Sequence, residues 1–292
     1  MRKARLAAIA DSNAHKKLFL LLNDNPFNSQ CGKNCGIIIT DITITLEHEE
    51  TNMYMDYTYV IYVLPAILLS MIAQAMVKSR FAKFNKVASK RGITGAQAAA
   101  ILLRANGITD VQIGRIRGSL TDNYNPGTKI LSLSESTYAS TSIAAIGVAA
   151  HETGHAIQHN VGYAPLAFRR VLVPVANIGS RFGPLLAILG IVIGNVAQAQ
   201  EYIPLSICQL VTNIGLLLFA ASVLFYIVTL PVEFNASRRA LKILKETGTL
   251  ESDELGGVRK VLWAAAMTYV ASALTAIGSF LRLLVLTGRR RS

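Results

Sequence analysis

The chain has 292 residues, of which 52% are hydrophobic and 16% are charged, and its formal net charge is +12. Soluble domains usually carry about a quarter charged residues, so this composition excludes an ordinary soluble protein, while the remaining charge excludes a chain of membrane helices alone. The high apolar content excludes a disordered chain, and three cysteines are too few for a disulfide framework. The basic residues flank apolar runs, so we expect the lipid bilayer, and not nucleic acid, as a partner.

Residues 1–52 differ in character from the rest of the chain. Their charge is balanced, and their apolar patches are too short for a membrane span or a signal-peptide core. We expect them to be either an N-terminal extension or an artefact of an upstream start codon. Cys31 and Cys35 in this segment have the spacing of half a metal site, but no second cysteine pair follows.

Four uncharged stretches approach or exceed the length that crosses roughly 30 Å of hydrocarbon. They indicate a first transmembrane helix within residues 53–77, a membrane hairpin over residues 182–232 and a C-terminal apolar helix that begins at residue 261. If this last helix crosses fully, the basic tail at residues 289–291 ends outside, against the positive-inside rule, so we expect three or four transmembrane helices. Cys208, inside the hairpin, is expected to pack as a small apolar side chain.

The charge around the first span predicts the orientation of the chain. Six Lys and Arg residues follow it between Lys78 and Arg91, whereas only Asp56 stands directly before it. By the positive-inside rule, residues 78–181 are then cytoplasmic. Because a hairpin returns the chain to the side it left, residues 233–260 are expected on the same face and can share one site with residues 78–181.

Residues 78–181 carry the signals of a small α+β domain. Thr94 and Gln97 have capping-box spacing, and Gly107 stands where a helix C-terminus favours glycine. Two strands are expected on either side of an Asn-Pro-Gly turn, and serine and threonine residues at 140–142 offer N-caps for a long helix. The expected elements are a helix over 94–106, strands over 111–116 and 129–133, and a helix over 143–160.

The long helix contains the motif His151-Glu152-Thr153-Gly154-His155. Residues four apart lie on one face of a helix, so both imidazoles can reach one metal ion, and Glu152 beside them can accept a proton from an attacking water molecule. The alternative is a helix with two ordinary histidines. However, three of the five histidines in the chain fall within nine residues of this predicted helix, which favours a hydrolytic Zn²⁺ site.

A zinc site of this kind needs a third protein ligand. His159 lies eight residues from His151, a rise of about 12 Å along an unbroken helix, and is expected to be a satisfied polar residue or a partner of a ligand. Glu233 is the better candidate, since the hairpin brings it to the same face and Pro231 predicts a helix start just before it. The alternative for Glu233 is an interfacial charge favoured by the helix dipole.

Further residues are candidates for contact with a substrate. Peptidases of this kind commonly hold an extended polypeptide against an edge strand, and residues 129–133 are candidates for that strand, with burial in the core as the alternative. Tyr124 and Arg238 are both candidates for stabilising an oxyanion.

The chain resembles the YugP-type neutral zinc metallopeptidases of prokaryotic membranes. The resemblance covers residues 53–291 and rests on the runs AAIGVAAHETGHAIQH, GYAPL, VPVANIGS and LPVEFNASRRA. A more distant similarity links it to the HtpX-type membrane gluzincins. These resemblances imply a zincin-like domain in which His151, His155 and Glu233 are zinc ligands and Glu152 is the general base. The HtpX-type enzymes usually carry an acid four residues after the ligand Glu, where this chain has Ser237.

The residues and the resemblance together predict a multi-pass cell-membrane protein whose active site faces the cytoplasm. Its expected activity is that of a zinc metalloendopeptidase with one Zn²⁺ per chain. The expected substrate is a polypeptide, with membrane proteins among the candidates. The alternative is a non-catalytic membrane protein in which the metal holds helices together or binds a partner. A transporter is disfavoured, because no charge lies within the core of the predicted hairpin.

Overall fold

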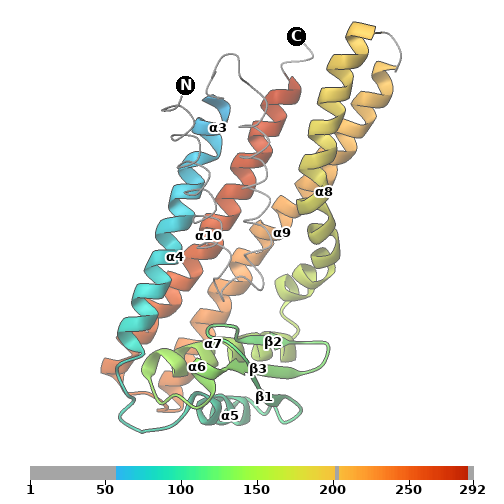
Figure 1. The fold of residues 1–292 in the computed structure, drawn as a ribbon. Helices are drawn as coiled ribbons and strands as arrows, with labels where there is room; N and C mark the ends of the chain where they lie inside the picture. The colour runs from blue at the N-terminus through green and yellow to red at the C-terminus, as the bar shows by residue number, and fades with distance from the viewer. Residues whose placement is uncertain (1–56, 201–203, 289–292) are drawn as a thin grey trace, which may run out of the picture.

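The computed structural model describes residues 57–200 and 204–288 (Figure 1). Over these residues the chain is mainly helical, with one small three-stranded sheet. Long apolar helices rise from a small domain that contains the sheet (Figure 1). The fold class predicted from the sequence is therefore confirmed. The predictions for residues 1–52, including Cys31 and Cys35, and for the basic tail lie outside the described residues.

Four helical segments of the described chain are long and apolar enough to cross a membrane. Helices α3 (Tyr57–Tyr62) and α4 (Leu64–Phe84) form the first, and α8 (Ala164–Gln200), α9 (Leu205–Glu246) and α10 (Ser252–Gly288) provide the others. The boundary expected at residue 182 falls inside α8, which already begins at Ala164. At 37 residues, α10 is long enough to cross completely.

Helices α8 and α9 form a closely packed hairpin. A Cβ atom on Gly215 would lie 2.4 Å from the backbone nitrogen of Ala187, and one on Gly183 would lie 2.8 Å from the backbone nitrogen of Phe219. Small residues at these positions let the two backbones approach each other, as is typical of membrane helix pairs. Cys208 is 2% exposed, as predicted for a small apolar side chain.

Pro231 does not begin a helix, contrary to the prediction from the sequence. Helix α9 runs without interruption from Leu205 to Glu246, and Pro231 lies inside it. A proline removes one backbone hydrogen bond, but such a loss is tolerated in apolar helices whose neighbours hold them in place. As a result, Glu233 lies in the interior of a 42-residue helix instead of a first turn.

The small domain begins with α5 (Gly95–Ala105), where Thr94 and Gln97 form the predicted capping box. The sheet contains β1 (Gln112–Ile116), β2 (Asn123–Asn125) and β3 (Ile130–Ser134) in the order β1-β3-β2. Strand β3 is parallel to β1 and antiparallel to β2. Of the two alternatives for residues 129–133, the structure shows burial in the core and not an edge strand, because β3 lies between β1 and β2 and its Leu131 and Leu133 are fully buried.

Helix α7 (Ile143–Asn160) follows the short helix α6 (Glu135–Tyr138) and lies at the centre of the small domain. The Ser142 hydroxyl accepts a hydrogen bond from Ala145 N at 3.1 Å, which is the predicted N-cap. Apolar side chains from α5, α7, α9 and α10 form one buried core around it, including Leu102, Ile146, Leu244 and Val258. This core fixes α7 against the end of α9.

Candidate metal centre

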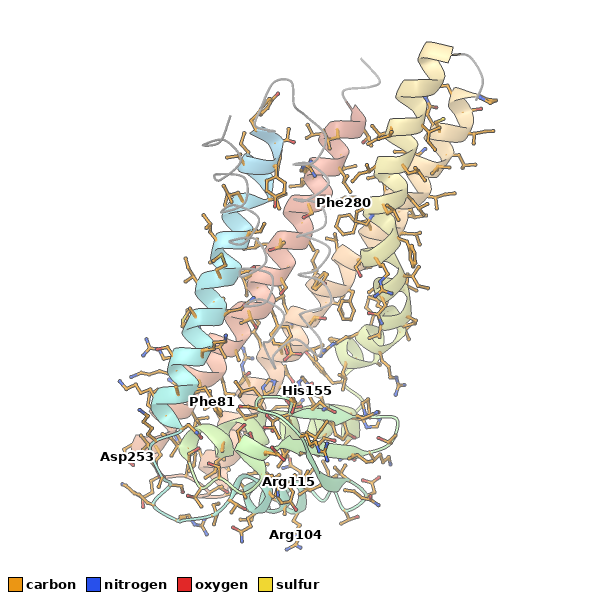
Figure 2. All side chains as sticks on the ribbon, viewed as in Figure 1. Phe81, Arg104, Arg115, His155, Asp253 and Phe280 are labelled. Atoms are coloured by element: carbon orange, nitrogen blue, oxygen red, sulfur yellow. The ribbon has the colours of Figure 1, made fainter. Side chains whose placement is uncertain are left out.

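The site lies where the small domain meets the apolar helices. Figure 2 shows His155 at this junction, with Arg104 at the end of the domain away from the long helices and Phe280 among those helices. Gly154 permits this arrangement, because a Cβ atom on it would lie 2.6 Å from the backbone oxygen of Ala236 in α9. The backbones of α7 and α9 therefore touch between the two histidines.

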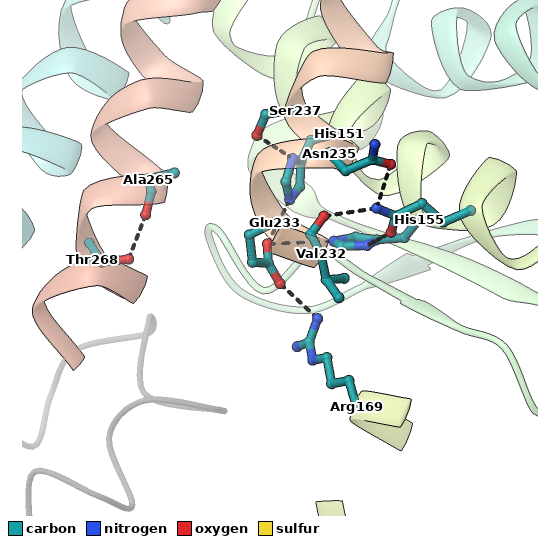
Figure 3. Close-up of polar contacts among 10 residues, drawn as sticks. His151, His155, Arg169, Val232, Glu233, Asn235, Ser237, Ala265 and Thr268 are labelled. Atoms are coloured by element: carbon teal, nitrogen blue, oxygen red, sulfur yellow. Dashed lines mark hydrogen bonds and ion pairs between the residues drawn. The ribbon is translucent and has the colours of Figure 1, made fainter. Parts of the chain in front are cut away.

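The two histidines of the motif and Glu233 meet in this contact (Figure 3). The Glu233 Oε2 atom lies 3.2 Å from His151 Nε2 and 3.6 Å from His155 Nε2. The side chain of Glu233 is 2% exposed, and those of His151 and His155 are 14% and 11% exposed. Within residues 57–200 and 204–288, this is the one group of His, Cys, Asp and Glu side chains found with metal-ligand spacing.

The chemistry and spacing of these donors fit a zinc ion. Two imidazoles and a carboxylate are a common ligand set of catalytic zinc, which leaves a fourth position open. Ligand atoms about 2.1 Å from a tetrahedral metal are about 3.4 Å from one another. The two nitrogen-to-oxygen distances lie on either side of that value, and all three candidate ligand atoms lie within 4.8 Å of one another.

Each histidine has a hydrogen-bonding partner for its other ring nitrogen. Ser237 Oγ lies 3.1 Å from His151 Nδ1, and Gln158 Oε1 lies 3.0 Å from His155 Nδ1. Gln158 is fully buried and donates from Nε2 to Val232 O and to Asn235 Oδ1. Such contacts fix the orientation of the rings, so that both Nε2 atoms point to the same place (Figure 3).

Arg169 is a member of the site that sequence reasoning missed. Its Nη1 atom donates to Glu233 Oε1 at 2.7 Å, and its side chain is 17% exposed (Figure 3). Gln158 was missed as well, although its position three residues after His155 on one helix is a usable signal. No comparable pattern links Arg169 to Glu233, which is 64 residues further along the chain.

Glu152 is 9% exposed on the same turn of α7. Burial raises the pKa of its carboxyl group to about 7, and nearby Asp122 and Glu233 act in the same direction, whereas His151 lowers it. A carboxyl group with a pKa near neutrality can both accept and return a proton, which is what a general base in hydrolysis does.

The other candidates from the sequence, Tyr124, His159 and Arg238, make no hydrogen bond or ion pair with His151, His155 or Glu233 in the described part of the chain. His159 Nδ1 and the Tyr124 hydroxyl are 2.8 Å apart, so these two residues are partners of each other. His159 is thus a satisfied polar residue, in line with the expectation for it. Arg238 is exposed, one residue beyond Ser237 on α9.

Comparison with known proteins gives the class of this chain. Residues 59–288 match the family model described as "Putative neutral zinc metallopeptidase". A curated relative, "Putative membrane protease YugP" of Bacillus subtilis (strain 168), is 42% identical over 233 residues, which is 79% of this chain and 98% of the relative. No solved structure matches the chain.

The chain is therefore a member of the family described as "Putative neutral zinc metallopeptidase", as its resemblance to YugP-type proteins predicted. The matched region contains all four long apolar helices from residue 59 onward and the whole of the small domain.

Proposed function

We propose that the protein is a membrane-anchored zinc metalloendopeptidase with one Zn²⁺ per chain. His151, His155 and Glu233 are the zinc ligands, and Glu152 is the general base. The observation that carries the proposal is the convergence of three ligand atoms, all within 4.8 Å of one another, from two helices far apart in the sequence. The membership of the chain in a zinc metallopeptidase family supports the same function.

These positions give the zinc ion and Glu152 different roles in hydrolysis. Bound zinc would polarise the peptide carbonyl and lower the pKa of a water molecule in its open position. Glu152 takes the proton of the attacking water and returns it to the leaving amine, for which a pKa of about 7 is suited. Burial of the site excludes bulk water and strengthens the electrostatic contribution of each of these groups.

The substrate is a polypeptide, which we propose binds in extended form along β2. This strand is an edge of the sheet, contacts the same helix as the histidines and is drawn on the side of β3 that is nearer to the apolar helices (Figure 1). An extended chain can add to such an edge through backbone hydrogen bonds. The basic residues after the first span favour a cytoplasmic orientation of the site at the inner face of the cell membrane.

The test is to measure the metal content and the proteolytic activity of three purified full-length proteins. We expect one zinc per chain in the wild type and in Glu152→Gln, with activity abolished in Glu152→Gln. Glu233→Ala is expected to lose most of the metal.

Cleavage by Glu152→Gln at the wild-type rate would contradict the proposed mechanism. Full biological activity of Glu152→Gln, combined with its loss in His151→Ala, would favour the non-catalytic alternative, in which the metal only joins α7 and α9.

A further inference from the structure

Arg169 makes a contact with the metal centre from a third element. Helices α7 and α9 provide the candidate ligands, whereas Arg169 lies in the second turn of α8. Among the described residues, it is the one Arg or Lys side chain with an ion pair to this cluster. Its Nη1 atom is 2.7 Å from Glu233 Oε1, and Glu233 is almost fully buried, so the contact is largely shielded from solvent.

The contact divides the two carboxylate oxygens of Glu233 between different partners. Oε1 accepts the hydrogen bond from Arg169, and Oε2 faces the Nε2 atoms of His151 and His155. A carboxylate held in this way offers one oxygen to a metal. Without the guanidinium group, both oxygens are available, and the carboxylate can turn about its terminal bond or bind through both oxygens.

We infer that Arg169 is a positioning residue of the metal centre, which holds Glu233 so that only Oε2 serves as a ligand. The inference rests on the proposed zinc site and extends it to α8. Ser237 and Gln158 have the same relation to the two histidines, so each of the three ligands has one partner that orients it.

A merely structural role for Arg169 would be to join α8 to α9. However, the two helices already touch along the hairpin, where Gly179, Gly183 and Gly215 bring the backbones together. The hairpin contact does not depend on one ion pair near its end. Loss of Arg169 should therefore affect the metal centre before it affects the packing of the two helices.

The experiment measures zinc affinity of the full-length protein in detergent by competition with a chelator. We expect Arg169→Gln to bind zinc about 10- to 100-fold more weakly than the wild type. Arg169→Lys keeps a positively charged donor but lacks the planar guanidinium group. We expect its zinc affinity to lie between that of the wild type and that of Arg169→Gln. Arg170→Gln is the matched control, because the neighbouring Arg170 is exposed and has no ion pair with Glu233.

A second readout separates positioning from general stability. Co²⁺ replaces Zn²⁺ in sites of this kind, and its visible spectrum reports the coordination geometry. We expect the Co²⁺ spectrum to change in Arg169→Gln and to match the wild type in Arg170→Gln. In a Glu233→Gln background, the Arg169→Gln change should no longer alter the metal affinity, because its effect passes through the carboxylate.

Wild-type zinc affinity and an unchanged Co²⁺ spectrum in Arg169→Gln would overturn the inference, even if proteolysis were lost, since Arg169 would then act on the substrate. If Arg169→Gln weakened zinc binding by the same factor in the Glu233→Gln background, the inference would be overturned as well. Failure of the wild type and Arg170→Gln to bind zinc would instead refute the proposed function. If Arg169→Gln does not fold, the Arg169→Lys variant gives the same comparisons.

Discussion

Ser237 gives one of the two histidines of the candidate site a neutral hydrogen-bonding partner. The HtpX-type enzymes usually carry an acid at this position, where this chain has Ser237, and the sequence alone assigns no partner to the ring of His151. The structure gives the hydroxyl of Ser237 that contact, at 3.1 Å from His151 Nδ1. A neutral oxygen here accepts or donates a hydrogen bond without adding a second buried charge beside Glu233.

We expect Ser237→Ala to weaken zinc binding by about tenfold, because His151 loses the contact that fixes its ring. Ser237→Asp should bind zinc at least as tightly as the wild type, since a carboxylate is a stronger acceptor for an imidazole N–H. Chelator competition measures both effects. Ser180→Ala, which removes an exposed hydroxyl on α8, is the control, and equal affinities for Ser237→Ala and the wild type would contradict the prediction.

At this scale, local spacing determines what can be predicted. His151, Glu152 and His155 follow from the geometry of a single helix, so the motif alone predicts their proximity. Glu233 could be proposed because a hairpin returns the chain to its starting side. Arg169 could not be proposed, because its contact with Glu233 depends on the relative rotation of α8 and α9, which no local pattern in this sequence encodes.

At the scale of elements, the contact between α7 and α9 determines whether the site exists. Gly154 stands between the two histidines, and the space that a side chain would occupy is filled by the backbone of α9 at Ala236. Backbone cannot move aside as a flexible side chain can. The glycine is therefore required by the close approach of the helices, while its backbone conformation is one that any residue can adopt.

We expect Gly154→Ala to lower the free energy of unfolding by about 1–3 kcal/mol, as overpacking of a tight contact does. It should also weaken zinc binding by more than tenfold, because α9 must move away and carries Glu233 with it. Unfolding curves and chelator competition measure the two effects. Gly256→Ala is the control, since nothing lies within 4 Å of the added Cβ atom in α10, and wild-type zinc affinity in Gly154→Ala would refute this account.

The elements themselves were predictable where capping and periodicity acted locally. The capping box of Thr94 and Gln97 and the N-cap at Ser142 are both present. Elsewhere, long-range packing outweighed the local signal or decided between alternatives. Pro231 remains inside α9 because neighbouring elements hold the helix, and residues 130–134 are central because the three-residue strand β2 pairs with β3 on the side away from β1.

At the scale of the whole molecule, the chain returns to its starting side between the histidines and Glu233. Helices α8 and α9 account for this path, and they bring residues 82 positions apart into contact. The positive charge after the first span indicates which side of the membrane this is. The orientation itself is open to a direct measurement.

We expect the end of α9 to face the cytoplasm and the turn of the hairpin to face outward. In a background with all three native cysteines replaced, Lys242→Cys should react with a membrane-impermeant thiol reagent only after cells are permeabilised. Leu205→Cys, next to the hairpin turn, should react in intact cells. Both residues are exposed, and the reverse labelling pattern would place the site on the outer side.

The order in which the chain is made gives the hairpin a further consequence. A ribosome that has released residues only as far as α7 has produced His151, Glu152 and His155, but not Glu233 of α9. The three candidate ligand side chains meet only after two more helices have been synthesised and inserted. Under the proposed function, the protein would stay inert while its nascent chain is still exposed to other newly made polypeptides, and would gain the capacity to hydrolyse them only when its own insertion is complete.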